Sequence, residues 1–212
     1  MSILPKALHR LGHRTLLRHL TNGAAPVASA ERELAVMFTD IVGFTELVET
    51  APPAAVASFL SGHFNVLARC IEREGGIVAR LLGDGLMAFW EAPRTATSAL
   101  RAARAIRNAV MADNRRRRAK DQPPIRLRIG LHVGPSVLAR LGREAHATPC
   151  GDAGNLAQRL EDVARHVDIG QEVTIVASEA VVARASGDFA FEPLGMLPVR
   201  GRQGRVRAYR LT

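Results

Sequence analysis

Two aspartates, Asp40 and Asp84, lie directly beside apolar segments of the sequence. Asp40 ends the run ELAVMFTD, and Asp84 is the only charged residue in LLGDGLMAFW, which covers residues 81–90. A charge between apolar runs is costly unless another group pairs with it. Either aspartate alone is explained by a helix cap or a turn. If the fold brings both together, their carboxylates could bind Mg²⁺, and the phosphates of a substrate would supply its other ligands.

The residues after Asp40, IVGFT, predict a glycine followed by the first turn of a helix. Backbone N–H groups in such a position can hold phosphate oxygens. We therefore predict phosphate contacts at Gly43, Phe44 and Thr45. With the two aspartates, this segment predicts a site for the triphosphate of a nucleotide.

The elements that must position these residues follow from the apolar patterns. The patterns predict a strand over 33–40, a helix over 52–75, two strands joined by a tight turn over 77–90, a helix over 96–118 and an alternating strand over 125–134. This β-α-β-β-α-β order is typical of the ferredoxin-like, α+β fold, in which the first strand lies antiparallel to the third. Asp40 should therefore meet Asp84 at one edge of the sheet.

The two ends of the chain add further elements to this core. A helix should begin at Gly151, and residues 172–212 predict two or three more strands and a short helix. Residues 1–32 predict an amphipathic helix over 2–21 and a linker, so that the compact domain would span 33–212. The helix could be a dimer contact or coupling element, a frayed helix against its own domain, or a membrane-surface helix.

Composition limits the partners. The net charge of +9 suits nucleotide phosphate, nucleic acid or anionic lipid. Aromatic residues are only 4% of the chain and none interrupts the basic run 115–118, so we expect no nucleic-acid partner.

No unbroken apolar run approaches the roughly 20 residues that cross a bilayer. Cys70 and Cys150 show no metal-ligand spacing and are too few for a disulfide scaffold, which favours the cytoplasm, including a cytoplasmic domain of a larger or membrane-associated protein. His63 and His132 should be hydrogen-bonded structural residues rather than ligands.

Four segments resemble, in order, the signatures of the class III nucleotidyl cyclases, the catalytic domains of adenylate and guanylate cyclases. They are FTDIVGFT (38–45), LLGDGLMAFW (81–90), IRLRIGLHVGP (125–135) and CGDAGNLAQRLE (150–161). The resemblance runs from about Glu33 to the C-terminus. It implies the class III cyclase fold and attack of the ribose 3′-oxygen on the α-phosphate of a nucleoside triphosphate, with release of pyrophosphate. It also implies a head-to-tail homodimer in which each interfacial site draws residues from both chains. Catalytic domains of this family often follow a sensor or membrane module, and the helix predicted over 2–21 resembles the element that joins them.

The resemblance also implies which residues bind metal and phosphate. Asp40 and Asp84 would hold two Mg²⁺ or Mn²⁺ ions per active site, with the backbone carbonyl of Ile41 as a minor ligand. Arg200 aligns with the lysine that contacts the terminal phosphates in the family. Arg202 could take that role instead, or both arginines could be solvated loop charges.

Asn155 and Arg159 match the pair that stabilises the transition state in the family. Their i, i+4 spacing places both on one face of a helix, as a joint clamp on ribose and phosphate requires. An arginine suits the charge that develops on the phosphorus. The alternative for Arg159 is a surface salt bridge with Glu46, Glu161 or Asp162.

The residues that would select the base depart from the family pattern. Arg80 replaces a lysine and Thr148 replaces an aspartate. Arg80 only donates and Thr148 can accept, which satisfies adenine. Arg80 cannot accept the N1 hydrogen of guanine but could donate to its O6, and Thr148 can serve either base. The sequence thus predicts an adenylate cyclase that converts ATP to 3′,5′-cyclic AMP. A guanylate or dual-specificity cyclase, or an inactive nucleotide-binding or dimerisation module, are the alternatives.

Overall fold

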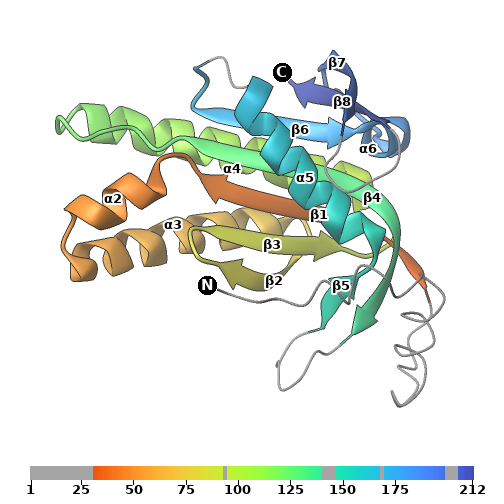
Figure 1. Cartoon of the computed structure of the whole chain (residues 1–212), viewed down its shortest axis with the longest axis horizontal. Coiled ribbons are helices and arrows are strands. Elements are labelled where there is room, and N and C mark those ends of the chain that lie inside the picture. The colour runs from red at the N-terminus through yellow and green to blue at the C-terminus, as the bar shows by residue number, and fades with distance from the viewer. Residues whose placement is uncertain (1–30, 93–94, 140–146, 168–169, 199–204) are drawn as a thin grey trace, which may run out of the picture. The chain divides into compact units, whose positions relative to one another are not determined.

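Strand β1 (Arg32–Ile41) lies inside a mixed sheet and is buried over most of its length (Figure 1). The computed structural model describes residues 31–92, 95–139, 147–167, 170–198 and 205–212. The other strands are β2 (Ile77–Leu82), β3 (Gly85–Trp90), β4 (Leu127–Ala139), β5 (Thr148–Cys150), β6 (Val173–Ser178), β7 (Phe191–Pro198) and β8 (Arg205–Leu211). Burial of both faces explains why β1 reads as a continuous apolar run.

The strand order among the described residues is β2-β3-β1-β4-β6-β8-β7, with β5 paired to the end of β4. β1 is antiparallel to both β3 and β4, as the ferredoxin-like prediction requires. The parallel pairing of β4 with β6 extends this core toward β8 and β7. The predicted α+β fold with additional C-terminal strands and a helix is therefore confirmed.

Helices cover both faces of the sheet (Figure 1). The helices are α2 (Phe44–Thr50), α3 (Pro53–Arg73), α4 (Thr95–Arg118), α5 (Asp152–Val167) and α6 (Glu179–Arg184). Side chains of α3 and α4 form the larger core cluster with one face of β1, β4 and β6. α5 packs on the opposite face, against β1 and β3 on one side and β6 and β8 on the other. The sheet is thus the middle layer of three.

α5 approaches β4 very closely at Gly130. A side chain there would collide with the backbone of Ala157 and of Glu161 on α5. Only a glycine permits this approach. The close contact fixes α5 over the middle of the sheet, where its residues can reach side chains of β4.

Helix α3 follows its predicted limits, with a proline at its first turn and a turn at Gly75 after its end. It is long and apolar enough to cross a membrane when judged by length and composition alone. In this structure its inner residues Leu67 and Ile71 are fully buried in the core beside α4.

Residues 31–212 group into one compact unit. The predicted helix over 2–21 and most of the linker lie outside the described residues. The division of the chain at residues 32 and 33 therefore stays a prediction.

Candidate active site

The structure brings Asp40 and Asp84 together at one edge of the β1–β3 pair. Thr39 on β1 is paired with Leu86 on β3, so the last residues of β1 face the turn that precedes β3. The Leu86 N–H donates a hydrogen bond to Thr39 Oγ1 at 3.2 Å, which fixes the turn against β1. The Asp40 and Asp84 carboxyl groups then lie within hydrogen-bonding reach of each other.

Glycines on both sides of Asp84 make this approach possible. Gly83 has a positive φ of 66°, which a residue with a side chain rarely adopts. A side chain at Gly85 would collide with the backbone carbonyl of Thr39. The Gly-Asp-Gly sequence is therefore what lets the tight turn press Asp84 against the end of β1.

The electrostatics of the pair favour a bound cation. Burial raises the pKa of the Asp40 carboxyl, the Asp84 charge raises it further, and Arg128 and Arg165 act in the opposite direction. Two adjacent carboxylates repel each other unless a proton or a cation lies between them. The described residues contain no cluster of three or more His, Cys, Asp or Glu side chains that could hold a metal alone. Asp40 and Asp84 form a pair of oxygen donors, which is the kind of site that Mg²⁺ or Mn²⁺ occupies together with phosphate oxygens.

Two further charged residues lie beside Asp40, and the sequence patterns assigned neither of them to the site. Arg128 on β4 is only 5% exposed, and its Nη2 donates to Asp40 Oδ2 at 2.8 Å. Its Nε lies 3.4 Å from Oε1 of Glu161 on α5, which is 7% exposed. Burial, and then the Asp40 charge, raise the pKa of Glu161 to about 7. A buried chain of charges thus leads from α5 to the first of the two aspartates.

The predicted phosphate-binding segment follows directly after β1. Gly43 has a φ of 76° and precedes α2, and nothing lies within 4 Å of the position that a side chain on it would take. The side chain of Phe44 packs against the core, so only its backbone could contact phosphate. Thr45 is exposed, whereas the side chain of Ile41 is buried in the core. Their roles stay predictions.

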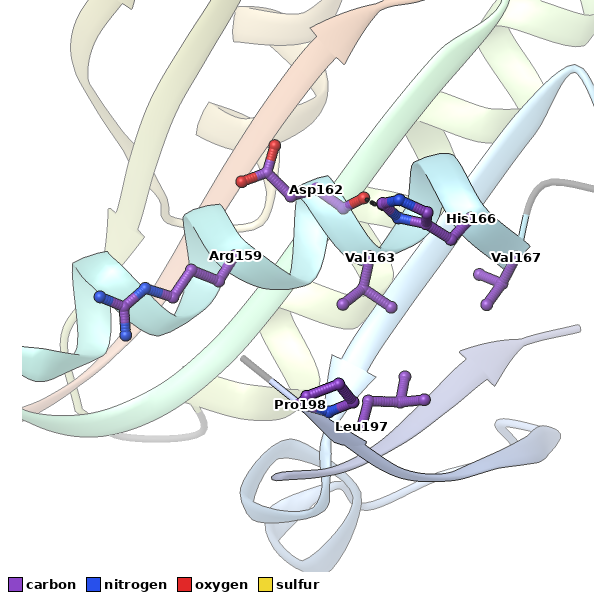
Figure 2. Close-up of a pocket in the computed structure, with 7 residues that line it drawn as sticks. All are labelled: Arg159, Asp162, Val163, His166, Val167, Leu197 and Pro198. Atoms are coloured by element: carbon purple, nitrogen blue, oxygen red, sulfur yellow. Dashed lines mark hydrogen bonds between the residues drawn. The ribbon is translucent and has the colours of Figure 1, made fainter. Parts of the chain in front are cut away.

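Asn155 and Arg159 lie one turn apart on α5, as predicted. Arg159 borders a pocket of about 450 Å³ that also includes Val163 of α5 and Leu197 and Pro198 of β7. Figure 2 shows Val163 facing these two β7 residues across the pocket. Arg159 has no hydrogen bond or ion pair with any other described residue, so the salt bridges considered as an alternative are not formed there.

The pocket also includes the last described residues before Arg200. β7 ends at Pro198, which lines the pocket together with Arg159, and Arg200 follows two residues later in the sequence. Arg200 and Arg202 themselves lie outside the described residues. Among the described residues, no hydrogen bond or ion pair joins Arg159 to Asp40 or Asp84.

The two predicted base-selecting residues come from strands that touch each other. Arg80 follows an irregularity in the β2–β3 pairing between Val78 and Arg80, and such bulges redirect the next side chain. Thr148 is buried in β5. β2 contacts β5, so the two strands lie beside each other (Figure 1).

The two histidines differ from each other. His132 is hydrogen-bonded as expected, with its Nδ1 2.7 Å from the Ser178 hydroxyl. His63 is buried, but its Nε2 has no hydrogen-bond partner in the part of the chain that the structure describes, so the expectation of a satisfied histidine was wrong there. Its ring instead stacks on Phe59 with 5.9 Å between ring centroids.

Comparison with known proteins agrees with this architecture. A family model described as the adenylate and guanylate cyclase catalytic domain matches residues 27–212. Adenylate cyclase 1 of Rhizobium meliloti (strain 1021) is 34% identical over 188 residues, which cover 86% of this chain and 28% of that protein. The chain thus spans less than a third of the length of this relative.

Solved structures show the same fold. The adenylyl cyclase CyaB from P. aeruginosa superposes with a TM-score of 0.78 at 24% identity, covering 87% of this chain and 95% of that one. The guanylate cyclase domain of RhGC from Catenaria anguillulae in complex with GTP gives a TM-score of 0.73 at 23% identity, covering 87% and 98%. With the family match over most of its length, the chain belongs to the adenylate and guanylate cyclase catalytic domain family.

Proposed function

We propose that this chain is an adenylate cyclase that converts ATP to 3′,5′-cyclic AMP and pyrophosphate. The observation that carries the proposal is the meeting of Asp40 and Asp84 at the end of β1, in a chain of this family. The name of the relative in Rhizobium meliloti supports adenine as the base.

The reaction closes a ring on the nucleotide. The ribose 3′-oxygen forms a bond to the α-phosphorus, the bond from that phosphorus to the oxygen bridging to the β-phosphate breaks, and the 3′-hydroxyl proton passes to solvent. Asp40 and Asp84 would hold two divalent ions, with the Ile41 carbonyl as a minor ligand. The ions would supply positive charge beside the triphosphate and the 3′-hydroxyl. Backbone N–H groups at Gly43, Phe44 and Thr45 would orient the phosphates.

We place the transition-state pair of each site on a second copy of the chain. Arg159 forms no hydrogen bond or ion pair with the two aspartates among the described residues. A head-to-tail homodimer would bring Asn155 and Arg159 of one copy over the aspartates of the other. Arg159 would offset the charge that grows on the phosphoryl oxygens, while Asn155 would orient the ribose. Arg200 would contact the terminal phosphates.

GTP is the second candidate substrate. Arg80 can donate to guanine O6 and Thr148 can serve either base. A structural neighbour of this chain is a guanylate cyclase domain in complex with GTP. A preference for ATP therefore depends on the inability of Arg80 to accept the N1 hydrogen of guanine.

Turnover with each nucleotide tests the proposal. The protein is incubated with ATP or GTP and with Mg²⁺ or Mn²⁺, and cyclic nucleotide and pyrophosphate are measured. Cyclic AMP should form at the higher rate, and Asp40→Asn and Asp84→Asn should each remove activity. Asp113→Asn on α4 is the matched control, because Asp113 pairs with Arg116 on an exposed surface and should leave turnover unchanged. Absence of any cyclic product with all four combinations would refute the assignment as an enzyme. Faster formation of cyclic GMP than of cyclic AMP would show that GTP is the preferred substrate.

A further inference from the structure

Arg128 is a buried cation that two carboxylates from different elements share. It lies 2.8 Å from Asp40 on β1 and 3.4 Å from Glu161 on α5. Only the contact with Asp40 is a hydrogen bond, since Arg128 Nε and Glu161 Oε1 both lack a hydrogen-bond partner among the described residues. Buried charged groups that make no hydrogen bond are costly. The guanidinium is therefore bound on one side and incompletely paired on the other.

We propose that Arg128 is the internal counter-ion of Asp40, that a divalent cation must displace it in order to bind, and that Glu161 then receives the guanidinium. This inference rests on the proposed role of Asp40 as a metal ligand. A divalent ion on Asp40 would repel the adjacent guanidinium and take over the oxygen that it occupies. Glu161 is the second carboxylate already within ion-pair distance of Arg128.

The geometry makes such an exchange a small movement. A shift of a few tenths of an ångström would bring Arg128 Nε and Glu161 Oε1 from 3.4 Å into the range of an N–H···O hydrogen bond. Glu161 lies where α5 approaches β4 closely, at Gly130. The exchange would give a partner to both atoms that lack one among the described residues.

The exchange would also connect two parts of the proposed machinery. Glu161 lies on the helix that carries Asn155 and Arg159, two residues beyond Arg159. Arg128 and Glu161 are therefore positioning residues that would link occupancy of the aspartates to the helix bearing the transition-state pair.

The test measures Mn²⁺ affinity of the full chain without nucleotide, by the electron paramagnetic resonance signal of free Mn²⁺ at pH 8. At this pH Glu161, whose pKa is about 7, is mostly ionised. Arg128→Met should tighten Mn²⁺ binding about tenfold, the order of one charge-assisted hydrogen bond. Weaker binding would overturn the inference, because it would mean that Arg128 orients Asp40 for the metal instead of competing with it.

Glu161→Gln should weaken Mn²⁺ binding several-fold in the wild-type background and have no effect in the Arg128→Met background. The matched control is Asp162→Asn, the same loss of charge at the adjacent exposed position. If Asp162→Asn weakens binding as much, or if the Glu161→Gln effect persists without Arg128, Glu161 acts only through its charge and the exchange does not occur.

Two controls keep these outcomes separate. Asp40→Asn should abolish Mn²⁺ binding; unchanged binding in that variant would refute the metal site itself rather than the exchange. Thermal unfolding reports whether each variant folds. If Arg128→Met does not fold, the comparison of Glu161→Gln with Asp162→Asn decides the question, because neither substitution changes side-chain volume appreciably.

Discussion

His63 couples the stability of the fold to pH. Burial lowers its pKa from the ordinary 6.5 to about 4, and the Asp113 charge opposes this only in part. Between these values the unfolded chain binds more protons, so the free energy of unfolding should fall as pH drops from about 6.5 to 4. At 1.36 kcal/mol per unit, the full loss is about 3 kcal/mol. Urea unfolding at pH 7, 5.5 and 4.5 measures it.

A pair of variants isolates this histidine from the carboxylates that also titrate in acid. His63→Phe, beside Phe59 and Phe64, should reduce the loss of stability between pH 6.5 and 4.5. His166→Gln, at an exposed position of α5, should leave the wild-type slope. A slope in His63→Phe equal to that of the wild type would assign the acid sensitivity to other groups.

At the residue scale, the sequence could identify Asp40 and Asp84 but not Arg128 and Glu161. Each aspartate interrupts or ends an apolar run, so a short stretch of sequence is enough to identify it. Arg128 lies in IRLRIGLHVG, where alternation of polar and apolar residues resembles a strand with one solvated face. β4 is instead covered on both faces, so Arg128 is buried and must find partners that are 33 and 88 residues away. No local pattern encodes such pairs.

At the scale of elements, α5 and β4 approach each other so closely at Gly130 that the packing leaves no room for a side chain. Gly130→Ala should destabilise the protein by about 1–3 kcal/mol, because the new methyl group meets the backbone of Ala157 and Glu161. Gly62→Ala on α3 is the control, since nothing lies within 4 Å of the added atom and alanine favours a helix. Chemical denaturation should show opposite signs for the two variants. Equal effects would contradict the close approach of α5.

The sequence predicted the long elements well, because α3, α4 and α5 repeat apolar residues at helical spacing and the core strands are strongly apolar. It did not predict β5, whose three residues are too few to show a period. It also could not give the order β6-β8-β7. Pairing of strands distant in sequence depends on which faces remain uncovered once the core has formed, and no local propensity records that.

At the scale of the whole molecule, the residues of the proposed site lie on different elements of the described chain. The two aspartates lie at the end of β1 and in the turn before β3, whereas Arg159 lies on α5 and borders a pocket with the last residues of β7. The sequence predicted this division only through the resemblance to a family of dimers. A two-fold axis would complete two equivalent sites from one pair of chains.

Mixing two inactive variants tests this arrangement directly. Asp84→Ala should lose the metal half of every site and Asn155→Ala the transition-state half, so that each variant alone is inactive. In a mixed dimer both defects fall in one site and the other site is intact. Random pairing of equal amounts should therefore restore about a quarter of the wild-type rate per chain. Cyclic nucleotide formation gives the rate and native mass spectrometry gives the fraction of mixed dimers. A mixture that contains mixed dimers and stays inactive would show that each site is built within one chain.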